Sequence, residues 1–130
     1  MVLQQLAELT GEQRWLDAAA SQLGFIAGRA ESYGSGVAFG LLAMMDAVYP
    51  HHELVACGAS GREELLSYLK HHPAHSVAIL LKTKENAETL SRIAPYTEAY
   101  PVPETGVQWY LCTNGACAMP VERFEQLHLE

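Results

Sequence analysis

Cys112 and Cys117 are the residues of this sequence whose types and spacing are best suited to chemistry. They flank the dipeptide Asn114-Gly115, which is typical of a tight turn because both residues tolerate positive φ. Such a turn could bring the two α-carbons within the few ångströms that a disulfide requires. The four intervening residues differ from the two of the thioredoxin-type CxxC motif, so that motif is absent here.

Zinc binding by these cysteines would need two further ligands, from Cys57 or from the histidines. His71 and His75 have i, i+4 spacing, but Pro73 between them breaks the helical register that makes this spacing useful. Three interpretations remain: buried reduced thiols, a reversible disulfide with Cys57 as a third participant, and a metal site. We favour buried thiols, with the histidines at the surface, and expect no metal and no cofactor.

A second candidate site is the glycine-containing segment that follows the first expected strand and opens a helix. In α/β proteins this position binds anions, since free amides and the helix dipole meet there. The segment is neither GxGxxG nor a Walker A loop, and an arginine stands where the GxSxG pattern has its last glycine. A plain tight turn is favoured over a phosphate or carboxylate site. The residues of the candidate anion site are Gly58, Ser60, Gly61 and Arg62.

The composition is that of a globular protein, and it disfavours several classes of partner. With 130 residues, 49% of them hydrophobic, the chain is one domain or one domain with a short appendage. A net charge of -7 with scattered basic residues disfavours nucleic acid as a partner. Neither an apolar run of membrane-spanning length nor an export signal is present, and the odd number of cysteines favours a reducing compartment. We expect a cytoplasmic protein that does not bind membranes.

Residues 1–49 are expected to be helical, with a break at the glycines that precede Val37. Beyond this break, Val37, Leu41, Met44 and Val48 form an apolar stripe at helical spacing. Other apolar residues fill much of the remaining circumference of this helix. A helix that is apolar nearly all round requires packing partners on more than one side. The segment therefore resembles a piece of a larger helical array or a self-association surface.

Residues 50–130 predict a small α/β subdomain. Short apolar runs that alternate with helical patterns are typical of βαβ units, and a continuous apolar run indicates a strand covered on both faces. We expect an α/β fold in which the helical hairpin segment precedes a mainly parallel three-stranded βαβαβα sheet, in the order 2-1-3, flanked by helices. The expected strands are 53–57, 76–81 and 107–112, and the expected helices are 63–69, 85–94 and one beginning at Pro120.

The C-terminal sequence carries a family resemblance. Residues 110–121 read YLCTNGACAMPV and are followed by FEQL at 124–127. This resembles the ending of the YyaL-like, spermatogenesis-associated thioredoxin-domain-containing family, whose members have a tyrosine, a Cys-x-Asn-x-x-Cys stretch and Pro-Val before a last helix. Family members often carry an aromatic residue where this chain has Gly115.

The resemblance implies a much larger parent protein, with a thioredoxin-like domain followed by an α/α toroid similar to six-hairpin glycosidases. Residues 1–49 would then be the last helices of that toroid, and residues 50–130 a C-terminal α/β subdomain. The thioredoxin-like active site and most of the toroid are absent from this chain, so no catalytic residue is carried over to it.

Three functions follow as hypotheses, and whether the chain is an enzyme is left open. The favoured one is a non-catalytic structural or interaction subdomain, which binds the remainder of the parent protein or self-associates through apolar helix faces. The second is part of a carbohydrate-active toroid enzyme, with Asp46 or Glu31 near a sugar cleft. The third is a thiol redox switch at Cys112 and Cys117.

Overall fold

The computed structural model describes residues 2–71 and 77–127 of the chain. The chain divides into two compact units, Met1–Pro50 and His51–Glu130. In the residues described, the first unit is helical and the second combines a β-sheet with helices. The protein therefore has a mixed α/β fold, as the sequence predicts.

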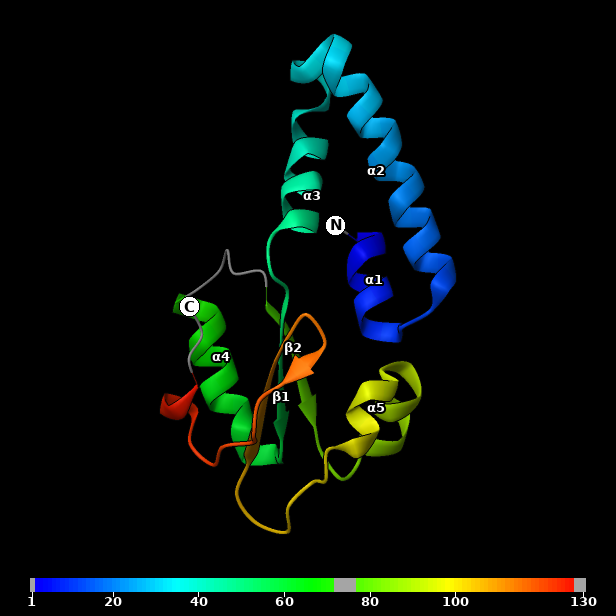
Figure 1. Cartoon of the computed structure of the whole chain (residues 1–130). Helices are drawn as coiled ribbons and strands as arrows, with labels where there is room; N and C mark the ends of the chain where they lie inside the picture. The colour runs from blue at the N-terminus through cyan, green and yellow to red at the C-terminus, as the bar shows by residue number, and fades with distance from the viewer. Residues whose placement is uncertain (1, 72–76, 128–130) are drawn as a thin grey trace. The chain divides into compact units, whose positions relative to one another are not determined.

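Three α-helices make up the first unit: α1 (Val2–Thr10), α2 (Gln13–Tyr33) and α3 (Ala38–Val48), as Figure 1 shows. The short 3-10 helix Gly34–Val37 joins α2 to α3 at the glycine-containing break. Not one residue of α3 is buried. The apolar third helix is thus present, but its neighbours in this unit cover only part of its surface.

The second unit is built on four strands: β1 (His52–Cys57), β2 (Val77–Lys82), β3 (Gln108–Thr113) and β4 (Ala116–Cys117). Their order in the sheet is β2-β1-β3-β4, which contains the expected order 2-1-3 of the first three strands. β1 pairs with β2 in parallel and with β3 antiparallel, and β4 pairs antiparallel with β3. The prediction of a mainly parallel three-stranded sheet is therefore wrong, since the sheet is four-stranded and mixed.

β3 begins at the end of the sheet where β1 and β2 finish. The connection from β2 to β3 contains α5 (Ala87–Ile93) and the 3-10 helix Pro95–Ala99. Its last residues stay at the carboxyl ends of β1 and β2, where Gly106 approaches Gly58, so β3 runs back antiparallel from there.

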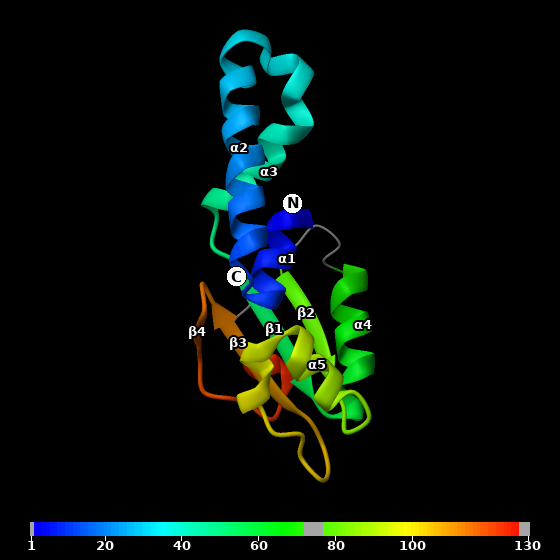
Figure 2. The ribbon, with the colours of Figure 1, turned by 90° about the vertical axis from the view of Figure 1, so that its right-hand side faces the viewer.

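Helices cover both faces of the sheet, with α4 (Arg62–His71) on one side and α5 on the other (Figure 1; Figure 2 shows the perpendicular view). This arrangement explains why the strands are apolar on both faces. The buried cluster on the α4 side consists of Leu54, Ala56, Leu65 and Trp109. The cluster on the other side consists of Val55, Cys57, Tyr100, Tyr110 and Cys112.

The helix expected from Pro120 is not formed in the described residues up to 127. Val121 is extended instead and exchanges two backbone hydrogen bonds with Trp109. A 3-10 helix of three residues, Phe124–Gln126, follows, and the ring of Phe124 packs edge-on against that of Trp109 at 5.0 Å. The apolar spacing that indicated a helix is thus satisfied by an extended segment and a single turn.

Candidate functional site

A disulfide joins Cys112 of β3 to Cys117 of β4. The two residues are register partners across the β3–β4 hairpin, and their α-carbons are 3.9 Å apart. Asn114 and Gly115 form the two-residue turn with φ values of 50° and 78°, the positive pair that a type I′ hairpin turn requires. The Asn-Gly dipeptide therefore brings the two cysteines together, and of the three interpretations of this pair the structure has the disulfide.

The two half-cystines differ in exposure. Cys112 belongs to the buried cluster on the face of the sheet that α5 covers, and it is 1% exposed. Cys117 lies on the two-residue edge strand β4 and is exposed. The disulfide thus connects the interior of the α/β unit to its surface.

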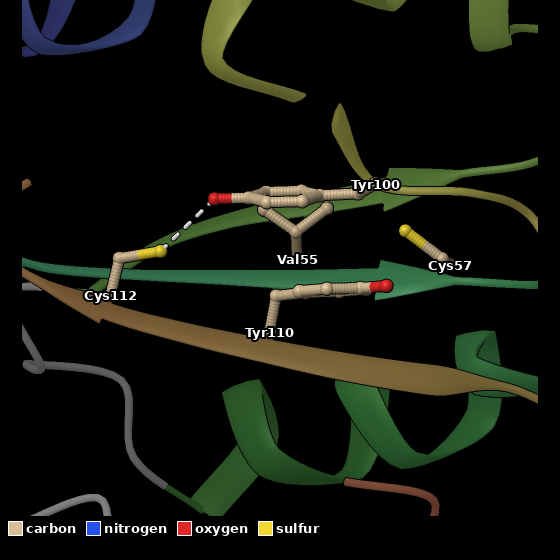
Figure 3. Packing of buried hydrophobic residues seen from close by; sticks show 5 residues of the cluster. All are labelled: Val55, Cys57, Tyr100, Tyr110 and Cys112. Atoms are coloured by element: carbon tan, nitrogen blue, oxygen red, sulfur yellow. Dashed lines mark hydrogen bonds between the residues drawn. The ribbon is translucent and has the colours of Figure 1, made fainter. Parts of the chain in front are cut away.

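The hydroxyl of Tyr100 lies against this disulfide. Its oxygen is 2.8 Å from Cys117 Sγ and 3.3 Å from Cys112 Sγ, and Figure 3 shows the second of these contacts. Because disulfide sulfurs carry no hydrogen, the tyrosine hydroxyl is the donor. Burial raises the pKa of Tyr100, and the nearby Glu53 and Cys57 raise it further, so the hydroxyl remains protonated at neutral pH.

Two contacts hold Tyr100 in this position. Its ring stacks on that of Tyr110, with centroids 4.2 Å apart and 12° between the planes, and Figure 3 shows the two hydroxyls pointing in opposite directions. The Nζ of Lys82 donates to the carbonyl oxygens of Thr97 at 2.6 Å and Tyr100 at 2.9 Å. Lys82 is only 4% exposed, so little water is available to accept hydrogen bonds from its ammonium group. The two carbonyl oxygens accept them instead.

Cys57 takes no part in the disulfide. In the register of β1 and β3, Cys112 is opposite Glu53 and Cys57 is opposite Gln108, a separation of four residues or about 13 Å along the strand. The stacked rings of Tyr100 and Tyr110 lie between the two sulfurs (Figure 3). Burial raises the pKa of the Cys57 thiol to about 11, even though Lys82 lowers it, so this thiol is unreactive at neutral pH.

The glycine segment after β1 has a packing role. Gly58 has φ +128°, and a β-carbon there would lie 2.4 Å from the carbonyl oxygen of Gly106. Gly61 is buried, and a β-carbon there would lie 2.8 Å from Val107 Cγ2. The amide of Gly58 donates to Lys82 O and that of Gly61 donates to Gly58 O, so neither is free for an anion.

A cavity of about 300 Å³ does lie at the carboxyl ends of β1 and β2. Gly58 and Ser60 line it, whereas Gly61 is buried beneath Val107 and Arg62 lies exposed on α4. The four residues of the expected anion site thus do not converge. Lys84 also lines the cavity, but its Nζ is 2.8 Å from a carboxylate oxygen of Glu104, whose pKa it lowers. That ion pair neutralises the cation that an anionic ligand would need.

The remaining candidates are dispersed. Glu31 is exposed beside the α2–α3 turn, and Asp46 is half-buried near the other end of α3. Within residues 2–71 and 77–127, no three His, Cys, Asp or Glu side chains are placed to hold a metal ion. His75, a member of the expected histidine pair, lies outside the described residues. No helix among the described residues has the length and apolar character needed to cross a membrane.

Sequence reasoning missed Tyr100 and Lys82, the residues that complete the disulfide environment. Lys82 ends an apolar run, where a lysine is usually the first exposed residue. Its position two residues after Leu80 was the available signal, because alternate strand residues share a face and Leu80 packs on the Tyr100 cluster. Tyr100 lies in an irregular connection, and no local pattern indicates the residue it contacts.

The chain was compared with protein-family models, curated proteins and solved structures, and none of them matches it.

Proposed function

We propose that this chain is a non-catalytic structural and interaction subdomain, whose helical unit binds neighbouring helices through an outward surface of α3. In this proposal it is the C-terminal part of a larger, cytoplasmic protein related to the YyaL-like thioredoxin-domain-containing family. The C-terminal Cys-x-Asn-x-x-Cys and Pro-Val sequence supports the family, and the side chains of α3 support the interaction role.

The large apolar side chains of α3 point away from the unit that contains them. We define the α3 surface as Phe39, Leu42 and Met45, which recur at intervals of three residues and so share one face, together with Tyr49, the exposed residue directly after the helix. Phe39 is 78% exposed and Leu42 is 50% exposed. Apolar residues grouped in this way on a helix are typical of an interaction site.

The side of α3 that contacts α1 and α2 carries small residues instead. Gly40 packs so closely on Ile26 of α2 that a β-carbon would lie 2.8 Å from Ile26 Cγ2. The carbonyl of Ala43 accepts a hydrogen bond from Gln4 Nε2 of α1 at 3.1 Å. The helix thus places Gly40 and Ala43 against its neighbours and exposes most of its large side chains, the reverse of what a self-sufficient three-helix unit requires. This reversal is the observation that carries the proposal.

The expected occupant of the α3 surface is an apolar helix face of the same kind, as in a helical array. In a solution of this chain alone, a second copy supplies such a face. We therefore expect the chain to associate as its concentration rises, measured by sedimentation velocity over a range of concentrations.

A matched pair of variants tests the location of this surface. Leu42→Ser should weaken the association, because it places a hydroxyl in the contact. Leu66 of α4 is 52% exposed, nearly the same as Leu42, so Leu66→Ser should leave association unchanged. A chain that remains a compact monomer at every concentration, or one whose association responds only to Leu66→Ser, would contradict the proposal.

A thiol switch at Cys112 and Cys117 is the second candidate, favoured by the bonded and partly exposed pair. In the cytoplasm a disulfide is held only transiently, and an exposed one is among the readily reduced kind. We expect the disulfide and dithiol forms to interconvert in glutathione buffers of increasing reducing strength, measured by alkylation and mass spectrometry. A disulfide that no such buffer opens in the folded chain would exclude the switch.

A further inference from the structure

The two sulfurs of the hairpin disulfide are unequal targets for an incoming thiol. Cys117 is exposed on β4, whereas Cys112 is 1% exposed and covered by the Tyr100 and Tyr110 cluster. Thiol–disulfide exchange requires access to the sulfur that is attacked. We propose that this disulfide is reduced by a dithiol reductant that attacks Cys117 Sγ, with Cys112 as the leaving group and the Tyr100 hydroxyl as its hydrogen-bond donor.

The exchange proceeds in two steps. A thiolate of the reductant forms a bond to Cys117 Sγ, the Cys112–Cys117 bond breaks, and its electron pair passes to Cys112 Sγ. The second thiolate of the reductant then attacks its own mixed-disulfide sulfur and releases Cys117 as a thiolate. The chain gains two electrons and two protons, which are those that the dithiol loses as it becomes a disulfide.

Tyr100 is already in place for the first step. Its hydroxyl oxygen is 3.3 Å from Cys112 Sγ, where negative charge develops, and 2.8 Å from Cys117 Sγ in the disulfide form. A small rotation of the O–H bond therefore transfers the hydrogen bond to the leaving sulfur without movement of the ring. The stack on Tyr110 and the Lys82 contact to the Tyr100 carbonyl fix the ring before the reaction begins.

This inference rests on the thiol-switch candidate, and the first experiment separates the two. The oxidised chain is mixed with glutathione as a monothiol probe, quenched with acid after short times, alkylated and analysed by peptide mass spectrometry. We expect glutathione on Cys117 and the alkyl group on Cys112, with Cys117 preferred by about tenfold or more. Glutathione mainly on Cys112 overturns the inference while leaving the switch intact, whereas a disulfide that stays closed overturns both.

The second experiment tests the hydroxyl of Tyr100. Tyr100→Phe keeps the stacked ring and removes only the donor, so reduction by dithiothreitol should slow by about tenfold, as expected for the loss of one hydrogen bond to a charged group. Tyr110→Phe is the matched control, because it keeps the ring that stacks on Tyr100 and removes only a hydroxyl that donates to Gln108 Oε1 and not to a sulfur. The control should change the rate by less than about twofold.

The readout is the rate for folded chain, with folding of each variant checked by circular dichroism. Equal rates for Tyr100→Phe and Tyr110→Phe would contradict the role of Tyr100. A faster reaction of Tyr100→Phe would mean that the hydroxyl stabilises the disulfide form instead, which also contradicts it.

Discussion

The helical unit and the α/β unit use apolar residues in opposite ways. In the α/β unit, both faces of β1 are covered, and Leu54 and Val55 are fully buried on alternate sides. In the helical unit, Gly40 makes the close contact with α2, while Phe39 is among the most exposed large side chains of the described residues. The α/β unit buries its own core, and the helical unit leaves many of its large apolar side chains exposed.

The helical unit is the more apolar of the two in sequence, yet it exposes more of its large apolar side chains in the described residues, so the placement of these side chains and not the apolar content decides what is buried. A sheet covered on both faces buries adjacent residues of one strand. Among the described residues of the three helices, those that are buried are Gln4, Ala7 and Ala19, which are polar or small, so this unit buries little apolar area of its own.

The largest effect expected from a test of this comparison is the loss of stability caused by truncating a core leucine. Leu54→Ala should lower the free energy of unfolding by about 3 to 4 kcal/mol, because it leaves a cavity between tightly packed layers. Leu42→Ala should change it by less than about 0.5 kcal/mol in the monomer, because the side chain is half exposed on a helix. Urea denaturation at low protein concentration measures both, and comparable losses would remove the distinction between the units.

A glycine in each unit sharpens the comparison further. Gly58→Ala should cost about 2 to 3 kcal/mol, since the new β-carbon meets the rigid Gly106 carbonyl at 2.4 Å and φ is +128°. Gly40→Ala should stay within about 1 kcal/mol of zero, because the Ile26 side chain can move and alanine favours the helix. Urea denaturation measures both changes in the free energy of unfolding. A Gly58→Ala variant as stable as the original chain would show that the segment after β1 is not held against Gly106.

The smallest expected effect concerns the exclusion of water from the buried thiol of Cys57 in the α/β unit. The folded chain keeps the proton of Cys57 up to about pH 11, whereas an unfolded thiol loses it near pH 9. The unfolded chain therefore loses the thiol proton at a lower pH than the folded chain does. The free energy of unfolding should fall by about 1 to 2 kcal/mol between these pH values. Cys57→Ala should have a shallower loss over this interval, because it removes the thiol and with it the charge by which Cys57 raises the pKa of Tyr100 and Tyr110. Identical pH profiles would mean that water reaches Cys57.

Local sequence patterns predicted much of this fold. The apolar runs indicated the strand–helix–strand unit of β1, α4 and β2, and Asn114-Gly115 indicated the turn between β3 and β4. β4 was missed because a two-residue strand has no periodicity of its own. Val121 was assigned to a helix because its spacing to Phe124 suits one, but the backbone partner that makes it extended, Trp109, is twelve residues earlier.

What the sequence by itself determined is therefore the helical character of the first unit, the β1–α4–β2 succession and the turn at Asn114-Gly115, since these depend on residues within one turn or one period. Only the tertiary structure decided the direction of β3, the burial of Lys82 and the contact of Tyr100 with the disulfide. It also decided that Gly58 serves packing and that Cys57 lies about 13 Å from Cys112 along the strand. These features depend on strand register and on contacts between segments that are distant in the sequence. The register is selected by the burial of both sheet faces and not by any local pattern.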